Sequence, residues 1–281
     1  MRASRQFADQ LVVVTGAASG IGRATALAFA RAGAELFVCD LPGQGLAELE
    51  AELLAEGARG VHAAFADVGS REQMANFCEL VCGISTPDVL VNNAGVGLAG
   101  GLLATSLSDW QWIMNVNLWG VIHGCHYFAP KMAARGRGQI VNIASAAGYY
   151  NSELMTAYGT TKSAVIGLSE GLRAELLPLG VGVSVVCPGF INTPIVANMR
   201  LRGAAYPESE RESLRRFFEQ RNFGPERVAA QVLRAARKNP ALLPVTPEAW
   251  ALYALKRIAP DLGRRVLVTL QSWGRRGSSK P

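Results

Sequence analysis

The sequence predicts an α/β protein in which helices cover both faces of a parallel, doubly wound sheet of about seven strands. Short apolar runs rich in β-branched residues alternate with longer segments whose apolar residues recur three and four positions apart. The runs are mostly apolar and do not alternate with polar residues, which is typical of parallel strands buried on both faces. Alternating strands and helices imply right-handed crossovers between parallel neighbours. The expected strands cover residues 11–15, 35–40, 61–66, 89–92, 139–143, 181–187 and 242–245.

We expect one domain followed by a helical extension. The 281 residues are 49 % apolar and 18 % charged, a composition that supports a large core. We therefore predict a main domain over residues 1–246 and a basic C-terminal extension over residues 247–281. Two segments of the extension, 247–260 and 261–273, have apolar residues at helical spacing. We expect them to cover the domain or a neighbouring subunit, and a peripheral contact with a membrane surface is the alternative.

Charge and cysteine usage exclude several classes of protein. Seven basic residues and Asp261 after residue 255 account for the whole net charge of +6, so no nucleic-acid surface is expected on the main domain. The N-terminus has no signal-peptide pattern, and no apolar run is long enough to span a membrane. The five scattered cysteines predict a reduced, cytoplasmic protein. Cys78 with Cys82, and His123 with His126, lack further ligands nearby in the sequence, so no metal site is expected.

A glycine motif follows the first predicted strand and opens the first helix. In TGAASGIGRA, Gly16, Gly20 and Gly22 are spaced G-x3-G-x-G, with Ser19 and Ile21 between them. Glycines at such a turn let the backbone approach a pyrophosphate, and the helix N-terminus favours its negative charge. The motif therefore predicts a dinucleotide site, although an ordinary glycine-rich turn would have the same composition.

Asp40 ends the second predicted strand, 18 residues after Gly22. A carboxylate at this place can accept hydrogen bonds from both ribose hydroxyls of an adenosine, and it would repel a 2′-phosphate. Neither Leu41 nor Ser19 supplies a positive charge, so we expect NAD in preference to NADP. The alternative role of Asp40 is to cap the next helix.

Small and polar residues also follow the third and fourth predicted strands. Asp67 and the backbone of Val68 are expected to face the adenine, unless Asp67 only caps the next helix. Asn93, Ala94 and Gly95 lie where the sheet would approach the cofactor. The asparagine pair that begins this segment is expected to hold the strand ends together rather than take part in chemistry.

Three residues indicate acid–base chemistry at the carboxyl ends of the sheet. Ser145 follows the fifth predicted strand, while Tyr158 and Lys162 share one face of a predicted helix over residues 156–177. A nearby ammonium stabilises a phenolate, and ~1.4 kcal/mol of stabilisation lowers a pKa by one unit. We therefore expect Lys162 to lower the pKa of Tyr158 and make it a general base near neutral pH. Packing with a surface charge is the alternative.

The order of these motifs resembles the short-chain dehydrogenase/reductase family, which comprises NAD(P)-dependent oxidoreductases on a Rossmann fold. The resemblance spans residues 10–240 and depends on TGAASGIG, NNAG, NVN before LWG, Ser145, YGTTK and PGFINT. It implies that Tyr158 is the catalytic acid and base and that Lys162 lowers its pKa and binds the nicotinamide ribose. It further implies that Ser145 positions and polarises the substrate oxygen.

The resemblance assigns further residues and an assembly. Asn117 would hold a water of the proton relay through its backbone, in a kinked helix. Pro188, Gly189 and Thr193 would contact the nicotinamide end of the cofactor. Family members usually form homodimers or homotetramers through two long helices, here expected over residues 110–134 and 156–177.

By the same resemblance, substrate contacts come from residues 96–100, 146–155 and 194–221, the last being a mobile lid. These stretches are mostly apolar, and the first two contain no basic residue. We expect hydride exchange with a neutral, hydrophobic secondary alcohol or ketone that is steroid-like, retinoid-like or long-chain. An NADPH-dependent carbonyl reductase and a non-catalytic dinucleotide sensor or scaffold are the alternatives. The expected substrate contacts are Val96, Ser145, Tyr149, Met155, Tyr158, Ile195 and Met199.

Overall fold

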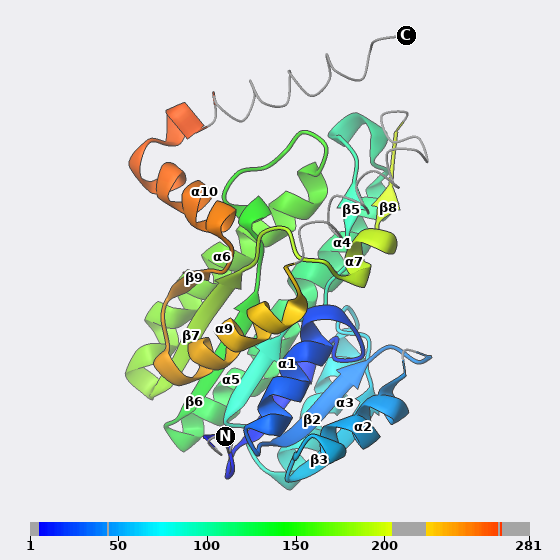
Figure 1. Ribbon diagram of the computed structural model, residues 1–281, viewed down its shortest axis with the longest axis vertical. Helices are drawn as coiled ribbons and strands as arrows, with labels where there is room; N and C mark the ends of the chain where they lie inside the picture. The colour runs from blue at the N-terminus through cyan, green and yellow to red at the C-terminus, as the bar shows by residue number, and fades with distance from the viewer. Residues whose placement is uncertain (1–5, 44, 204–222, 264, 266–281) are drawn as a thin grey trace.

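The structure, a computed structural model, describes residues 6–43, 45–203, 223–263 and 265. Its centre is a seven-stranded parallel sheet in the order β3-β2-β1-β4-β6-β7-β9, with helices on both faces (Figure 1). This arrangement confirms the predicted doubly wound sheet. Its strands are β1 (Leu11–Thr15), β2 (Glu35–Asp40), β3 (Gly60–Phe65), β4 (Val89–Asn92), β6 (Gly138–Ile143), β7 (Val181–Cys187) and β9 (Leu242–Pro244).

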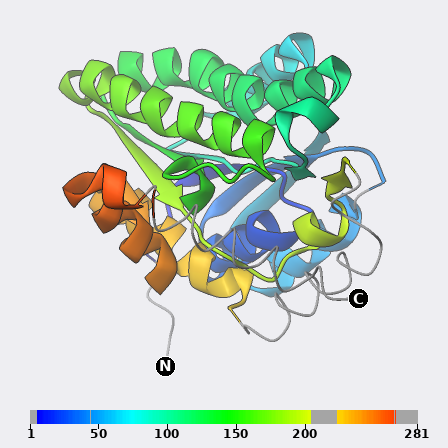
Figure 2. The same ribbon diagram turned by 90° about the horizontal axis from the view of Figure 1, so that it is seen from above.

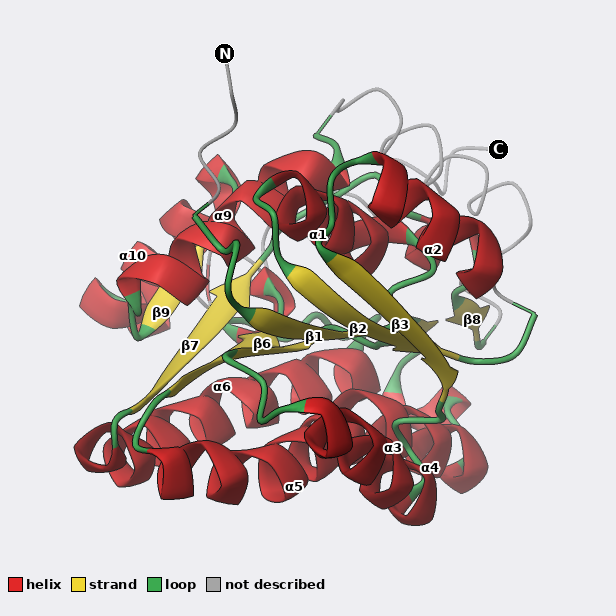
Figure 3. Cartoon of the chain, turned by 90° about the horizontal axis from the view of Figure 1, so that it is seen from below, coloured by secondary structure: helices red, strands yellow, loops and turns green. Residues whose placement is uncertain are grey.

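Two layers of helices enclose the sheet, as Figure 2 and Figure 3 show from opposite sides. One layer contains α1 (Gly20–Arg31), α2 (Leu46–Ala55) and α9 (Pro225–Lys238). The other contains α3 (Arg71–Ile84), α4 (Leu107–Met114), α5 (Gly120–Arg135) and α6 (Thr156–Leu176).

Each layer has its own core against the sheet. Every residue of β1, β4 and β7 is buried, which requires apolar cover on both faces. Large buried side chains on the side of α1 are Phe29, Leu36, Leu49 and Leu53, and those on the side of α5 are Met74, Phe77, Phe128 and Met132.

The strand order places a topological switch point at β1. The chain runs outward from β1 through β2 to β3 and then returns to β4, which lies on the other side of β1. The connections on the two sides therefore leave in opposite directions and open a crevice at the carboxyl ends of β1 and β4.

The long helix expected over residues 110–134 is interrupted. Residues Asn115–Trp119 form a π-helical turn between α4 and α5. A π turn adds a residue to one turn of the helix and so changes its register and direction. The predicted kink at Asn117 is therefore present, as a π turn.

Several short elements lie in the upper part of the molecule as Figure 1 shows it. Strand β5 (Leu98–Ala99) pairs in parallel with β8 (Arg200–Leu201), which follows the one-turn helix α7 (Pro194–Ala197). Helix α10 (Pro247–Ile258) is capped by Thr246, whose hydroxyl accepts a hydrogen bond from the Ala249 amide.

Two predictions extend beyond this part of the chain. Most of the second helix predicted for the C-terminal extension, and residues 204–221 of the expected lid, lie outside the described residues. Among the residues that the structure describes, no helix combines the length and the apolar character that crossing a bilayer requires.

Candidate active site

A cavity of about 1330 Å³ lies at the carboxyl ends of the strands. Residues that follow β1, β2, β3, β4, β6 and β7 line it, because parallel strands all end at the same edge of the sheet. Most of the predicted site residues are on its wall, namely Gly16, Ser19, Gly20, Ile21, Asp40, Asp67, Val68, Asn93, Ala94, Gly95, Val96, Ser145, Met155, Tyr158, Lys162, Pro188, Gly189, Thr193, Ile195 and Met199.

The glycine motif forms a cradle that a side chain would fill. Gly16 has a φ of +64°, and a Cβ added to it would lie 2.6 Å from the Cα of Ala94. Gly22 does not line the cavity. A Cβ there would collide with the carbonyl oxygen of Gly16 and the side-chain amide of Asn93, so its role is close packing of α1 on the strand ends.

The N-terminus of α1 faces the same cavity. Its N-cap residue, Ser19, makes no side-chain capping bond, and Ser19, Gly20 and Ile21 line the cavity. The first amide groups of a helix have no partner within the helix and carry partial positive charge. This donor set and the glycine cradle fit the pyrophosphate of a nicotinamide dinucleotide.

Asp40 is held at the end of β2 by the backbone. Its Oδ2 accepts a hydrogen bond of 2.8 Å from the Ala18 amide, and its Oδ1 accepts one of 2.8 Å from the Leu41 amide. Helix α2 instead takes Gly45 as its N-cap, so Asp40 does not cap the helix. The carboxylate is fixed at the cavity wall with lone pairs left for ribose hydroxyls.

Asp67 and Val68 follow β3 at the next position along the wall. Asp67 Oδ1 accepts a hydrogen bond of 2.8 Å from the Gly69 amide, which shapes the turn. The cap of α3 is Ser70, whose hydroxyl accepts a hydrogen bond of 3.3 Å from the Gln73 amide. Asp67 therefore belongs to the cavity wall and not to the helix cap.

The asparagine pair ties three strand ends together, as the sequence predicts. The side-chain amide of Asn93 donates to the carbonyl oxygens of Thr15 and Gly16, both at 2.9 Å. The buried amide of Asn92 donates to Oδ1 of Asn142 at 2.9 Å, across β4 and β6. These bonds fix the floor of the cavity relative to the glycine cradle.

Ser145, Tyr158 and Lys162 meet at the centre of the cavity wall. Lys162 is 4 % exposed, and its ammonium donates a hydrogen bond of 3.0 Å to the carbonyl oxygen of Ile143. The same Nζ lies 5.8 Å from the centroid of the Tyr158 ring. The Ser145 hydroxyl accepts from the Ala147 amide at 3.2 Å and faces the Tyr158 hydroxyl.

Burial dominates the proton affinities of this group. It raises the pKa of Tyr158, and a hydrogen bond with Ser145 opposes that rise. It also lowers the pKa of Lys162 to about 8. The direction found for Tyr158 is opposite to the lowering that the sequence predicts, because desolvation of the phenolate outweighs the hydrogen bond with Ser145.

Asn117 is fully buried inside the π turn and does not line the cavity. Its Oδ1 accepts from the Val96 amide at 2.8 Å, and its Nδ2 donates to the Val96 carbonyl at 2.9 Å. The side chain thus holds the segment after β4.

Tyr149, a predicted substrate contact, does not line the cavity. Tyr149 is 6 % exposed and packs in the core, with its ring centroid 5.4 Å from that of Tyr253. Its neighbour Tyr150 lines the cavity instead. The 3₁₀ turn Ala146–Gly148 directs the two tyrosines to different sides of the chain.

Several wall residues were missed because they come from distant parts of the sequence. Trp112 of α4, Leu201 of β8 and Leu252 of α10 line the substrate end of the cavity. Glu248 of α10 also lines it, and its Oε1 accepts a hydrogen bond of 3.1 Å from the Phe190 amide. The helical spacing of the C-terminal extension indicated a helix that covers the domain, but nothing in it identified which residues reach the site.

The histidine and cysteine pairs have structural surroundings. His123 is buried with its Nδ1 2.9 Å from the carbonyl oxygen of Val68, whereas His126 is exposed. Sγ of Cys78 lies 3.8 Å from Sγ of Cys82. Within the described ranges, no three histidine, cysteine or carboxylate side chains gather as a metal site would require.

Comparison with known proteins agrees with this geometry. A family model described as short chain dehydrogenase matches residues 10–203. The chain is 41 % identical over 262 residues to the probable oxidoreductase EphD of Mycobacterium tuberculosis, a match that covers 91 % of this chain and 44 % of that relative. The chain therefore spans less than half the length of this curated relative.

Solved structures give the same family. A short-chain dehydrogenase/reductase from Burkholderia phymatum in complex with NAD has a TM-score of 0.81 and 32 % identity, covering 95 % of this chain and 96 % of that chain. One from Sphingobium yanoikuyae in complex with NADPH has a TM-score of 0.74 and 27 % identity, covering 92 % and 95 %. The bound cofactors differ, so the likeness gives a nicotinamide dinucleotide without selecting one.

The family match covers most of the chain, including the glycine motif, Ser145, Tyr158 and Lys162, and the structure brings these residues to one cavity. The chain belongs to the short-chain dehydrogenase family, whose members are NAD(P)-dependent oxidoreductases acting on CH–OH groups.

Proposed function

We propose that the protein is an NAD-dependent dehydrogenase or reductase that exchanges a hydride with a neutral, hydrophobic secondary alcohol or ketone. The observation that supports this best is the composition of the cavity wall. Ser145, Tyr158 and Lys162 share one cavity with the glycine cradle and with a set of large apolar residues. Among the described residues on this wall, Lys162 alone is basic.

The chain's own groups handle the proton and the substrate oxygen. The nicotinamide, when bound, supplies or accepts the hydride. Tyr158 moves the proton at the substrate oxygen, and Ser145 hydrogen-bonds to the same oxygen. Lys162 has a pKa of about 8, so its ammonium exchanges protons readily near neutral pH. The apolar end of the cavity excludes water from this group.

The preference for NAD rests on Asp40. Its carboxylate is fixed by two backbone amides at the place where an adenosine ribose is expected. A 2′-phosphate there would meet a negative charge, and Leu41 beside it offers no cation. Repulsion between the Asp40 carboxylate and the 2′-phosphate disfavours NADP, so NADPH-dependent carbonyl reduction is the weaker alternative.

The substrate class follows from the other end of the cavity. Its wall includes the side chains of Trp112, Met155, Met199, Leu201 and Leu252. Such a surface stabilises a ligand with a large apolar body, and Glu248 adds a negative rather than a positive charge. A steroid-like, retinoid-like or long-chain alcohol fits this wall better than a small anionic acid.

The test is a panel of cyclic and long-chain secondary alcohols and ketones, followed by NADH absorbance and repeated with NADP and NADPH. We expect turnover with NAD on the bulky neutral members. Tyr158→Phe should keep NAD binding but lose at least about 100-fold in kcat, the usual contribution of a general acid–base group. Tyr149→Phe is the matched control, because it removes a hydroxyl nine residues away that does not line the cavity.

Other results would contradict the proposal in distinct ways. Tight NAD binding without turnover of any alcohol or ketone would favour a dinucleotide sensor or scaffold. Faster turnover with NADPH than with NADH would reverse the cofactor assignment. Near wild-type activity of Tyr158→Phe would remove Tyr158 from its role.

We also propose a homodimer or homotetramer, and a monomeric mass in sedimentation equilibrium would refute it.

A further inference from the structure

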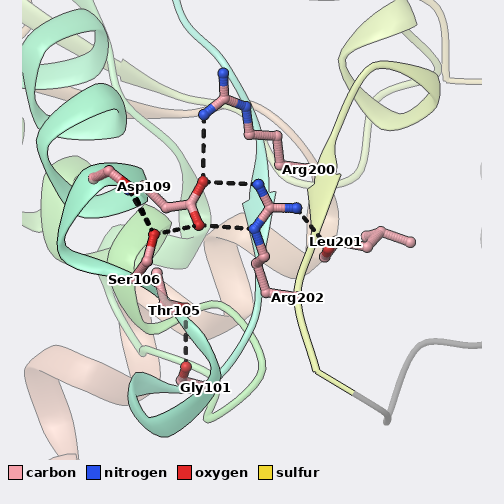
Figure 4. Close-up of polar contacts among 8 residues, drawn as sticks. Gly101, Thr105, Ser106, Asp109, Arg200, Leu201 and Arg202 are labelled. Atoms are coloured by element: carbon pink, nitrogen blue, oxygen red, sulfur yellow. Dashed lines mark hydrogen bonds and ion pairs between the residues drawn. The ribbon is translucent and has the colours of Figure 1, made fainter.

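A charged cluster outside the catalytic group joins α4 to the segment of β8 (Figure 4). We define the Asp109 cluster as Ser106, Asp109, Arg200 and Arg202. Asp109 is 5 % exposed. Its two oxygens accept hydrogen bonds of 2.7 Å and 2.9 Å from Nε and Nη2 of Arg202, a bidentate pair. Nη1 of Arg200 at 3.3 Å and the Ser106 hydroxyl at 2.8 Å complete the cluster.

The cluster joins two segments that are 91 residues apart in the sequence. Asp109 lies in the first turn of α4, whereas Arg200 begins β8 and Arg202 directly follows it. The pairing of β8 with β5 spans only two residues, with bonds from the Arg200 amide to Gly97 at 3.1 Å and from the Arg202 amide to Ala99 at 2.8 Å. So short a pairing is marginal without side-chain support.

Both sides of this junction border the cavity. Met199 and Leu201, next to the arginines in the chain, line it, as does Trp112, one turn beyond Asp109 in α4. The guanidinium of Arg200 lies 3.6 Å from the centroid of the Trp112 ring. Asp109 therefore holds in place the Arg200 guanidinium, which packs on Trp112. It also holds β8, which contains Leu201.

The charge on Asp109 persists over the working pH range. Its hydrogen bonds with Arg202 hold its pKa far below the usual range for a carboxyl group. A buried carboxylate bonded to a planar guanidinium fixes direction as well as distance, which a lysine in place of the arginine does not reproduce.

We propose that Asp109 is a positioning residue for substrate, which through Arg202 and Arg200 fixes Leu201 and Trp112 against the cavity and so sets the shape of the substrate that fits. The inference rests on the proposed function only where KM and kcat are measured. The glycine cradle and Asp40 belong to the β1–α1 segment and to β2, so we expect NAD affinity to change little when the cluster is weakened.

The chain offers a matched control at the opposite end of the sheet. Asp88, directly before β4, also pairs with two arginines, Arg135 at 3.2 Å and Arg137 at 3.7 Å. Its Oδ2 accepts a hydrogen bond of 3.0 Å from the Leu11 amide. Asp88→Asn therefore weakens a similar cluster that has no contact with the cavity wall.

The test compares wild type with Asp109→Asn, Arg202→Gln, Arg202→Lys and Asp88→Asn. Hydrogen exchange is measured over residues 97–101 and 198–203, together with the NAD dissociation constant and with KM and kcat on the panel. We expect faster exchange of both segments in Asp109→Asn and Arg202→Gln. KM for the bulkiest substrate should rise about tenfold, with a smaller change in kcat, since misplaced positioning groups weaken substrate binding. Arg202→Lys should restore only part of the loss.

Unchanged exchange in both segments, or KM changes equal to those of Asp88→Asn, would overturn the proposal. A weakened NAD affinity in Asp109→Asn would also overturn it, because the effect would then be global. Exchange is measured without substrate, so it decides the role of Asp109 even if no member of the panel is turned over. If Asp109→Asn does not fold, Arg202→Gln gives the same comparison.

Discussion

The buried ammonium of Lys162 should make the stability of the fold depend on pH in the alkaline range. Lys162 is 4 % exposed, and burial lowers its pKa from 10.5 to about 8. Below pH 8 both the folded and the unfolded chain carry the proton, and the cost of the buried charge is present in full. Between pH 8 and pH 10.5 the folded chain releases the proton first, so stability rises with pH through this window.

The size of the effect follows from the shift. A change of two to three pKa units corresponds to about 3 kcal/mol at ~1.4 kcal/mol per unit. We compare wild type with Lys162→Met, which keeps the aliphatic stem and removes the titrating group. The free energy of unfolding of wild type should gain about 3 kcal/mol on that of Lys162→Met between pH 7.5 and pH 10.5.

Urea unfolding at half-unit pH intervals, with a thiol reductant present, measures this difference. Cysteines and tyrosines that do not interact with Lys162 contribute equally to both proteins, so their contribution cancels in the comparison, and Cys187, which does interact with it, is replaced by alanine in both. Parallel stability curves for the two proteins would refute the reasoning, because Lys162 would then have its ordinary pKa in the folded chain. A gain on lowering the pH would contradict the sign of the shift.

Three further predictions concern packing and the cofactor. Gly22→Ala should lower both the Tm and the affinity for NAD, since its Cβ would collide with Gly16. Gly83→Ala in α3, with open space around it, should be neutral or stabilising by up to about 1 kcal/mol. Thermal unfolding and NAD titration measure both variants, and equal changes in Tm and NAD affinity would contradict the role of Gly22 in the cradle. Asp40→Ser should weaken NAD binding and strengthen NADP binding, because it removes both the acceptor for the ribose hydroxyls and the repulsion of the 2′-phosphate. Calorimetric titration with both cofactors checks it, and an unchanged ratio of the two dissociation constants would refute the role of Asp40. Phe128→Ala, at a fully buried position, should cost about 3–5 kcal/mol in urea unfolding, and a loss below about 1 kcal/mol would show that the α5 layer packs less closely than described.

Sequence patterns predicted well what depends on neighbouring residues. The seven strands were found because each is largely an apolar run, and the bounds agree within one residue. The glycine cradle and the helix face shared by Tyr158 and Lys162 were equally local. These features depend on backbone geometry and on a period of 3.6 residues, and both can be read from a short segment.

What the sequence could not give depends on distant segments. Tyr149 and Tyr150 are adjacent, yet a single 3₁₀ turn sends one into the core and leaves the other at the cavity. Trp112, Leu201 and Leu252 reach the site from three elements that contact it through the tertiary fold alone. The pairing of Asp109 with Arg202, 93 residues on, leaves no periodic signal in the sequence.

The same distinction explains the proton affinity of Tyr158. Spacing correctly places an ammonium near a phenol, and attraction between the charged forms favours phenolate. The sign of the net pKa shift also depends on how much water remains around both groups. That amount of water is set by β6, the segment after β4 and the substrate end of the cavity together. In this fold the ammonium is turned toward the Ile143 carbonyl and is almost fully buried, so its own pKa falls while that of Tyr158 rises. The electrostatic role of Lys162 is therefore a property of the assembled cavity and not of the four-residue spacing.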